Sequence, residues 1–245
     1  MVEGQVRARI VSVLEVFLCS GFPTQIALAV VFGTAGFGVL EPAGQLSLAG
    51  VVALLLGNAA FVIGLIFYFL REHGERPWNI FVGTRAIGGE LRIGLMLLPI
   101  VLVLAAGSVA LLHRVWPDLR NVPQNPFETL LQSPTEAALF TIVAVGAGAI
   151  GEELQRAFIL RRFEQHLGGG WVGLVVFSIL FGLGHQMQGW DAAIVTGLLG
   201  LLWGVLYLTR RSVVPAVVSH AGFNIVQIAI AVNSDVTASI GSVLG

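Results

Sequence analysis

The stretch VVALLLGNAAFVIGLIFYFL, residues 51–70, decides the fold, because it contains no charged side chain over its whole length. A helix of about 20 mostly apolar residues is long enough to cross the hydrocarbon core of a membrane. In the whole chain of 245 residues, 56% are hydrophobic and 11% are charged, and the mean hydropathy is +0.88. Soluble domains carry roughly 25% charged residues. The chain is therefore predicted to be an integral membrane protein.

Six further segments resemble this one in length and apolar character. The seven predicted spans are approximately 12–37, 46–70, 93–112, 137–160, 169–187, 191–209 and 213–233. The first is expected to be a retained helix, since its apolar stretch is too long for a signal peptide. Little of the chain is left for a soluble domain. We predict one transmembrane domain, residues 1–245, that folds as an all-α polytopic bundle of about seven helices.

The positions of the arginines indicate how the bundle is oriented. All thirteen basic residues are arginines, and cytoplasmic loops carry the excess of positive charge in membrane proteins. With the N-terminus inside, ten arginines fall on the cytoplasmic side, two fall on the other side, and Arg156 lies within a span. The ten are Arg7, Arg9, Arg71, Arg76, Arg85, Arg92, Arg161, Arg162, Arg210 and Arg211. We predict a multi-pass protein of the plasma membrane with a cytoplasmic N-terminus and an external C-terminus.

The composition also excludes several classes of function. The net charge of −1 leaves no polybasic surface for nucleic acid. The absence of lysine excludes Schiff-base chemistry and the lysine of a phosphate-binding loop. Cys19 is the only cysteine, so no disulfide can form within the chain, and we expect it to be a small buried side chain. Gly200 and Gly204 form a GxxxG pair that is expected to serve helix packing.

Ionisable side chains are costly inside a membrane, so those retained in a span are candidates for function. Such polar residues occur in five of the predicted spans, and six of them lie in the fourth, fifth and seventh. Glu152, Glu153 and Arg156 lie in the fourth, His185 in the fifth, and His220 and Asn224 in the seventh, while Glu15 and Asn58 complete the set. We interpret the first six as a candidate catalytic set, because two carboxylates, two imidazoles and an amide can together activate water against a peptide carbonyl.

The spacing within the set suggests a division of work. On a helix Arg156 shares a face with Glu152 and adjoins Glu153, so it can neutralise one carboxylate and leave the other as a general base or acid. His220 and Asn224 are four residues apart and can both donate to an oxyanion. The structural alternatives are an ion pair that only locks the fourth helix and ordinary hydrogen bonds between helices.

Water can be activated in two ways by these residues. In the favoured interpretation a carboxylate and an imidazole act directly, and no cofactor is required. In the other, a divalent metal such as zinc is held by Glu152, His185 and His220, although the HExxH spacing of many zinc hydrolases is absent. A serine mechanism is disfavoured, because there is no GxSxG motif and Ser219 is adjacent to His220 in sequence.

Three short motifs resemble a known family. They are GEELQRAFILRR (151–162), FGLGH (181–185) and SHAGFN (219–224). Their order is similar to the EExxxR, FxxxH and HxxxN signature of the CAAX protease and bacteriocin-processing family, also called the Abi family, which are intramembrane endopeptidases. The resemblance covers about residues 137–230, the expected catalytic core, whereas residues 1–136 fit only as general N-terminal helices.

The resemblance implies a role for each matching residue. A glutamate and His185 would activate and orient the water, His220 and Asn224 would stabilise the oxyanion, and Arg156 would brace the glutamate pair. The implied substrate is a peptide or protein at the membrane, so the expected partners are lipid and such a substrate. Prenylated substrates follow only from the family name.

The first motif departs from the family pattern, because Arg156 follows Glu153 by three residues instead of four. If the arginines fix the register, Glu152 takes the second glutamate position and Gly151 replaces the catalytic glutamate. If the glutamate pair fixes the register, Glu152 is the base and Glu153 its partner. A local π-bulge can absorb such a shift of one residue. We favour the second alignment, in which activity is retained.

The predicted span ends do not place the site residues at one depth. Helical rise puts Glu152 about 13 Å and His185 about 24 Å from the inner ends of their spans.

Two other functions stay open beside the endopeptidase. One is a catalytically inactive scaffold, chaperone or bacteriocin-immunity protein of the same family, and the other is a proton-coupled transporter, which the absence of inverted repeats disfavours.

Overall fold

The computed structural model describes residues 2–41 and 44–244, and helices make up most of them. The α-helices are α1 (Val2–Cys19), α2 (Phe22–Thr34), α3 (Leu48–Glu72), α4 (Pro77–Phe81), α5 (Ile87–Val115), α6 (Pro134–Val143), α7 (Glu152–His166), α8 (Gly170–Leu183), α9 (Trp190–Arg210) and α10 (Val214–Leu244). A π-helix, η3 (Ala144–Gly151), joins α6 to α7. Short 3-10 helices are η1 (Pro117–Leu119), η2 (Pro126–Leu130) and η4 (Gln186–Gln188).

The helical membrane bundle predicted from the sequence is confirmed, with fewer full spans than seven. Among the described residues, five helical segments are long and apolar enough to cross a membrane, and a bent pair of helices makes a sixth. The five are Leu48–Glu72, Ile87–Val115, Pro134–His166, Trp190–Arg210 and Val214–Asn233. The bent pair and a short helix stand where the first and fifth predicted spans were expected.

The first predicted span, 12–37, is broken. Helix α1 ends at Cys19, α2 begins at Phe22, and the two are bent by 44°. Gly21 adopts φ +82°, a conformation that glycine reaches without steric cost. Pro23 lies in the first turn of α2, where its missing N–H costs nothing, but it could not continue α1.

The fifth predicted span, 169–187, is shorter than expected. Helix α8 has 14 residues and ends at Leu183, so His185 lies in the turn after the helix and not within it. Gly189, at φ +118°, lets the chain turn into α9. The apolar run therefore divides into a short helix and a tight connection.

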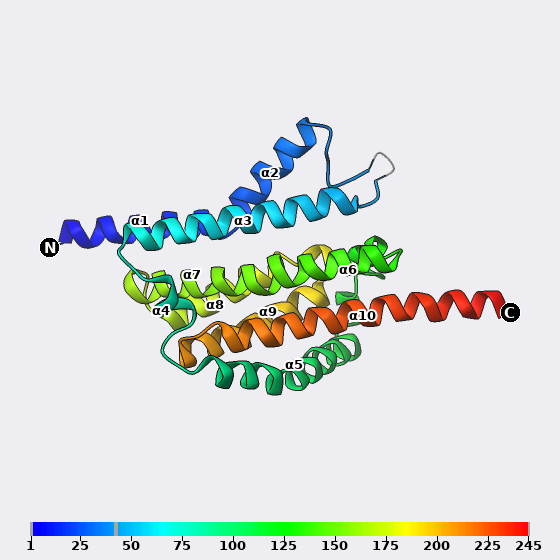
Figure 1. Ribbon diagram of the computed structural model, residues 1–245. Helices are drawn as coiled ribbons and strands as arrows, with labels where there is room; N and C mark the ends of the chain where they lie inside the picture. Colours follow the sequence, from blue (N-terminus) through cyan, green and yellow to red (C-terminus); the bar gives the residue numbers. More distant parts are fainter. Residues whose placement is uncertain (1, 42–43, 245) are drawn as a thin grey trace.

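The connections between the helices lie at two ends of the bundle (Figure 1). At one end lie the N-terminus and the turns that follow α3, α7 and α9. All ten arginines predicted to be cytoplasmic belong to segments at or near this end. The predicted cytoplasmic arginines therefore gather at one end of the bundle, and the C-terminal helix ends at the other.

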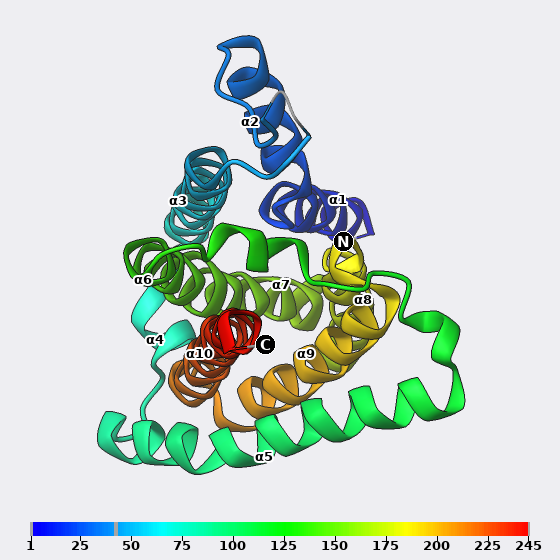
Figure 2. The same ribbon diagram turned by 90° about the vertical axis from the view of Figure 1, so that its right-hand side faces the viewer.

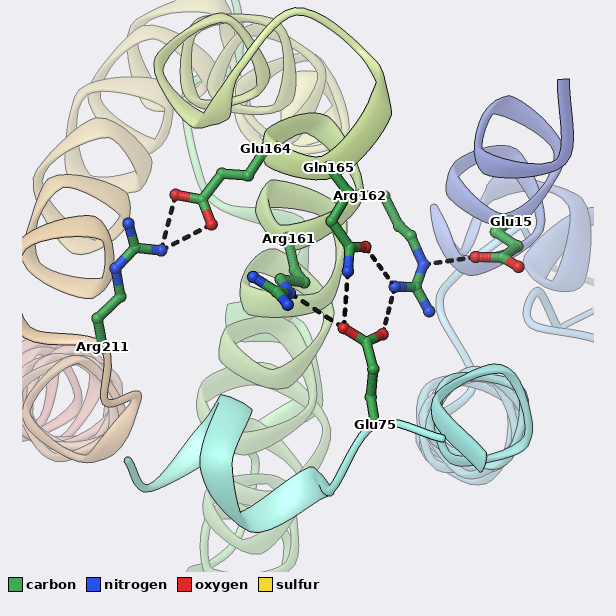
Figure 3. Close-up of polar contacts among 7 residues, drawn as sticks. All are labelled: Glu15, Glu75, Arg161, Arg162, Glu164, Gln165 and Arg211. Atoms are coloured by element: carbon green, nitrogen blue, oxygen red, sulfur yellow. Dashed lines mark hydrogen bonds and ion pairs between the residues drawn. The ribbon is translucent and has the colours of Figure 1, made fainter. Parts of the chain in front are cut away.

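Helix α7 lies at the centre of the bundle, with α1 and α3 on one side of it and α9 and α10 on the other (Figure 2). A cluster of charged side chains surrounds the C-terminal end of α7 (Figure 3). Arg162 donates from Nε to Glu15 Oε2 and from Nη1 to Glu75 Oε2, each at 2.5 Å. Arg161 and Gln165 also donate to Glu75, at 3.0 and 2.8 Å. These contacts fix α1 and the connection after α3 to the helix that carries the glutamate pair.

Candidate active site

The glutamate pair begins a regular α-helix directly after a π-helix. Residues 144–151, AVGAGAIG, form η3, and Glu152 is the first residue of α7. π-Helical segments are rare in proteins, and those that occur are often found at functional sites. The π-helix precedes the pair, whereas the shift considered from the motif lies between Glu153 and Arg156. The EExxR spacing itself is therefore ordinary α-helix.

Glu153 is the carboxylate that Arg156 neutralises. Its side chain is 1% exposed, and it accepts a hydrogen bond from Arg156 Nη1. His220 Nδ1 lies 3.0 Å from Glu153 Oε1. A carboxylate buried between a guanidinium and an imidazole is neutralised by the first and accepts charge-assisted hydrogen bonds from both. Glu153 therefore joins α7 to α10.

Arg156 is wholly buried, and aromatic rings surround its guanidinium. Its Cζ lies 4.6 Å from the ring centroid of Phe181 and 5.5 Å from that of Phe177. The GxxxG glycines of α9 leave room for this packing: a Cβ at Gly200 would lie 2.9 Å from Phe181 Cδ1, and one at Gly204 would collide with Leu174. The packing role predicted for these two glycines is confirmed.

Glu152 faces a different environment. Its side chain is 28% exposed, and the imidazole of His220 lies nearby, with Nε2 3.8 Å from Glu152 Oε2. Glu152 and His185 line the same cavity, which has a volume of about 120 Å³ and lies between α7, α8 and the α1–α2 break. Two candidate residues from separate motifs thus meet at one cavity, and the second glutamate does not reach it.

Glu152 and His185 meet because the helices that carry them form an antiparallel hairpin. Helix α7 continues to His166, beyond the predicted end at 160, and α8 begins at Gly170. Fourteen steps of chain separate Glu152 from His166, and fifteen separate Gly170 from His185, so a rise of about 1.5 Å per residue brings both to the same level. The difference in depth expected from the predicted span ends is therefore wrong.

The imidazole of His185 is held in one orientation. Its Nδ1 lies 2.8 Å from the carbonyl oxygen of Phe181, one helical turn earlier, and its ring packs edge-on against that of Phe181. Because a carbonyl only accepts hydrogen bonds, Nδ1 carries the proton and Nε2 is left as an acceptor. A water molecule in the cavity can be bound by that nitrogen.

His220 and Asn224 lie behind Glu152 and not on the cavity. His220 stacks on Trp203, and Asn224 Nδ2 donates to the carbonyl of Ala144, the first residue of the π-helix, at 3.0 Å. The Ser219 hydroxyl accepts a hydrogen bond from Trp203 Nε1 at 3.1 Å and donates one to the carbonyl of Pro215. These bonds are in keeping with the expectation that Ser219 is no nucleophile. Sequence reasoning missed Trp203, which is 1% exposed; an indole in the middle of a glycine-rich span was the available signal.

The residues considered for a metal do not converge. Over the described part of the chain, no group of three or more His, Cys, Asp or Glu side chains is placed to hold a metal ion. His220 directs Nδ1 to Glu153 and only Nε2 towards Glu152. The alternative triad of Glu152, His185 and His220 is thus not preassembled. Cys19 is buried, as predicted.

Comparison with known proteins agrees with the motifs. Residues 134–226 match the family described as "Type II CAAX prenyl endopeptidase Rce1-like", close to the range 137–230 that the motifs indicated. No curated protein and no solved structure matches the chain. At the level of the family, the match supports a CAAX-type intramembrane protease that acts on peptide or protein substrates at the membrane. Over residues 134–226, the chain is therefore similar to the Rce1-like type II CAAX prenyl endopeptidases.

Proposed function

We propose that this protein is an intramembrane endopeptidase that hydrolyses peptide bonds of membrane-associated, CAAX-like substrates, with Glu152 as general base and His185 as the residue that orients the water. The observation that carries the proposal is the shared cavity: Glu152 and His185 line it, and both present polar atoms that have no close partner among the described residues. A general base must lie within reach of the proton that it removes.

The two glutamates have different roles in this proposal. The carboxylate of Glu153 is bound by Arg156 and His220, whereas the side chain of Glu152 is partly exposed at the cavity. This difference supports the alignment in which the glutamate pair fixes the register of the motif. Glu152 then takes the catalytic position, and Gly151 does not replace it.

The reaction proceeds by direct attack of water. Glu152 takes one proton from a water molecule that also donates to His185 Nε2, and the water oxygen bonds to the carbonyl carbon of the substrate. The resulting tetrahedral oxyanion collapses, the C–N bond breaks, and the proton held by Glu152 passes to the leaving amine. The products are a carboxylic acid and an amine, and Glu152 returns to its initial state.

His220 and Asn224 are proposed to stabilise the oxyanion from behind Glu152, at the edge of the site and not within the cavity. His220 can donate from Nε2 only as an imidazolium, because its Nδ1 proton is bound by Glu153. One N–H of the Asn224 amide donates to the carbonyl of Ala144, and within the described part of the chain the second has no acceptor and can donate to a substrate. Arg156 acts through Glu153 and is a positioning residue. We further propose a plasma-membrane location with the N-terminus in the cytoplasm, and approach of the substrate from the arginine-rich side.

Cleavage of membrane-anchored peptides by the purified protein in detergent tests the proposal. We expect Glu152→Gln and His185→Ala to lose activity by at least about a hundredfold, since acid–base groups contribute roughly 10²- to 10⁴-fold. The control is Glu41→Gln, at an exposed carboxylate outside the cavity, which should cleave like the wild type. Folded wild-type protein that cleaves nothing would favour the scaffold function instead.

The same assay distinguishes the direct mechanism from metal activation. We expect a chelator to leave the rate unchanged, because the proposed step uses only carboxylate and imidazole. Loss of activity with chelator, restored by zinc, would instead require Glu152, His185 and His220 to rearrange around a metal ion.

A further inference from the structure

The cavity has two walls of different origin. One wall belongs to α7 and α8, inside the segment that matches the family. The other is the corner where α1 breaks into α2, and it contributes Val16, Ser20, Phe22 and Gln25. We call these four residues the corner wall. They precede residue 134, so the family match says nothing about them.

The corner is built tightly onto the catalytic helix. Gln155, three residues after Glu152, donates from Nε2 to the carbonyl of Cys19 at 2.6 Å. A Cβ at Gly21 would lie 3.2 Å from the same Nε2 and 3.3 Å from Asn58 Nδ2, so the backbone of the break approaches α7 closely. Together with the Glu15–Arg162 ion pair, these contacts hold the corner wall opposite Glu152.

The corner wall supplies the polar side chain of Gln25 to the cavity beside Glu152 and His185. Among the described residues, nothing forms a hydrogen bond with the carboxamide of Gln25, which is half-buried and lines the cavity with Glu152 and His185. A carboxamide can donate and accept at once, as a peptide group requires. A group of this kind beside a carboxylate and an imidazole fits the backbone of a bound peptide.

The cavity admits only a small group. Its volume is about 120 Å³, and an apolar cavity of roughly 150 Å³ holds a molecule the size of benzene. The space is therefore suited to one side chain. Phe22 borders it beside the histidine, since Phe22 Cζ lies 3.9 Å from where a Cβ of Gly184 would be.

We propose that the α1–α2 corner is a substrate-recognition element, in which Gln25 binds the peptide backbone next to the scissile bond and Phe22 limits the size of the adjacent side chain. This proposal rests on the proposed function, because it concerns the substrate of the same site. The N-terminal helices thereby set the specificity of a catalytic core that the family match describes.

Specificity of cleavage tests the role of Phe22. The measurement is kcat/KM for peptides that carry Ala, Leu or Phe beside the scissile bond. Phe22→Ala should raise the rate for the Phe peptide relative to the Ala peptide by about tenfold or more, since a change of pocket size is worth 10- to 200-fold. Gln25→Ala should lower all three rates by about tenfold. Ile26→Ala, at a neighbouring residue that is 66% exposed and does not line the cavity, should change neither the preference among the peptides nor the rates.

Cross-linking gives a second readout that needs no cleavage. Cys19 is the chain's only cysteine and is buried, so Gln25→Cys and Ile26→Cys can be labelled with little background. A peptide with a thiol-reactive group beside the scissile bond, applied to both variants in a Glu152→Gln background, should react preferentially at position 25. Equal reaction at 25 and 26, or unchanged peptide ratios in Phe22→Ala, would overturn the proposal. If the wild type cleaves no peptide, the proposed function fails, and cross-linking alone decides the role of the corner.

Discussion

The indole of Trp203 stacks on the imidazole of His220, with ring centroids 3.9 Å apart and planes within 13° of parallel. Trp203 also donates from Nε1 to Ser219 Oγ, on the same helix as the histidine. The indole thus fixes the plane of the ring, and Glu153 fixes its rotation through Nδ1. Together they direct Nε2 of His220 towards Glu152.

Removing the indole should therefore affect both stability and catalysis. Trp203→Ala is expected to lower the free energy of unfolding by about 3–5 kcal/mol, the usual cost of deleting a buried aromatic side chain, and to lower kcat in the protein that stays folded. Trp203→Phe keeps a ring against His220 and should retain most of both. Thermal unfolding in detergent and peptide cleavage measure the two effects.

The control for this pair is Trp171→Ala, at an indole that is 60% exposed near the start of α8. This substitution should change neither the free energy of unfolding nor kcat by much. A folded Trp203→Ala protein with wild-type kcat would show that the stacking does not position His220.

The sequence was sufficient for the class of fold and for the grouping of the motifs. Long apolar runs need a membrane or a core, and so few charges leave only the membrane. Glu152, His185 and His220 are ionisable residues inside those runs, and this alone makes them candidates for function. These inferences depend on composition and on cost in hydrocarbon, which are local properties of the chain.

Other features depend on packing and could not be predicted in the same way. The motif alone left open which glutamate Arg156 neutralises, because Glu152 and Glu153 both lie within its reach on a helix. The break at Gly21 and the end of α8 before His185 lie inside apolar runs that hydropathy cannot divide. The role of Trp203 depends on α9 crossing α10 at one position.

The charged cluster around Glu75 predicts how stability depends on pH. Burial raises the pKa of this carboxyl, but the hydrogen bonds and charge of Arg162, with Arg161 and Gln165, outweigh burial and hold its pKa below the ordinary value of 4.5. Its stabilisation is therefore full above pH 4.5 and is lost as the pH falls through the lower, folded-state pKa.

We expect Glu75→Gln to be less stable than the wild type by about 2 kcal/mol at neutral pH, the value typical of hydrogen bonds to charged groups. The difference should shrink steadily below pH 4.5. Unfolding in detergent at a series of pH values measures it, with Glu41→Gln as the control. A difference that grows on acidification would contradict the assignment.

A second contact network should position His185. The turn that carries His185 is held by the C-terminal end of α5 and by the connection that follows it. His113 Nε2, near the end of α5, lies 2.7 Å from Asp191 Oδ2, and Asn125, before η2, donates to Gln188 at 3.2 Å. Asp191→Ala releases the start of α9 and should lower kcat by up to about a hundredfold, as a misplacement of 1 Å can, while KM changes little. Asp191→Asn keeps an acceptor for His113 and should restore much of the rate.

The π-helix offers the most closely matched comparison in the chain. A Cβ at Gly148 would lie 3.2 Å from Asn224 Nδ2, whereas a Cβ at Gly146, two residues earlier in the same π-helix, would meet nothing within 4 Å. Replacement of glycine by alanine in a helix is otherwise worth about 0.5–1 kcal/mol of stabilisation. Both variants change the backbone in the same way, so they differ in whether Asn224 is displaced.

If Asn224 stabilises the oxyanion, Gly148→Ala should lower kcat by about tenfold or more with little change in KM, and Gly146→Ala should cleave at the wild-type rate. Removal of one oxyanion donor costs about 10²- to 10³-fold, so a displaced amide should lose part of that. Single-turnover cleavage separates this effect from substrate binding. Equal rates for the two alanine variants would show that the amide acts only on the Ala144 carbonyl, as a packing contact between α10 and the π-helix.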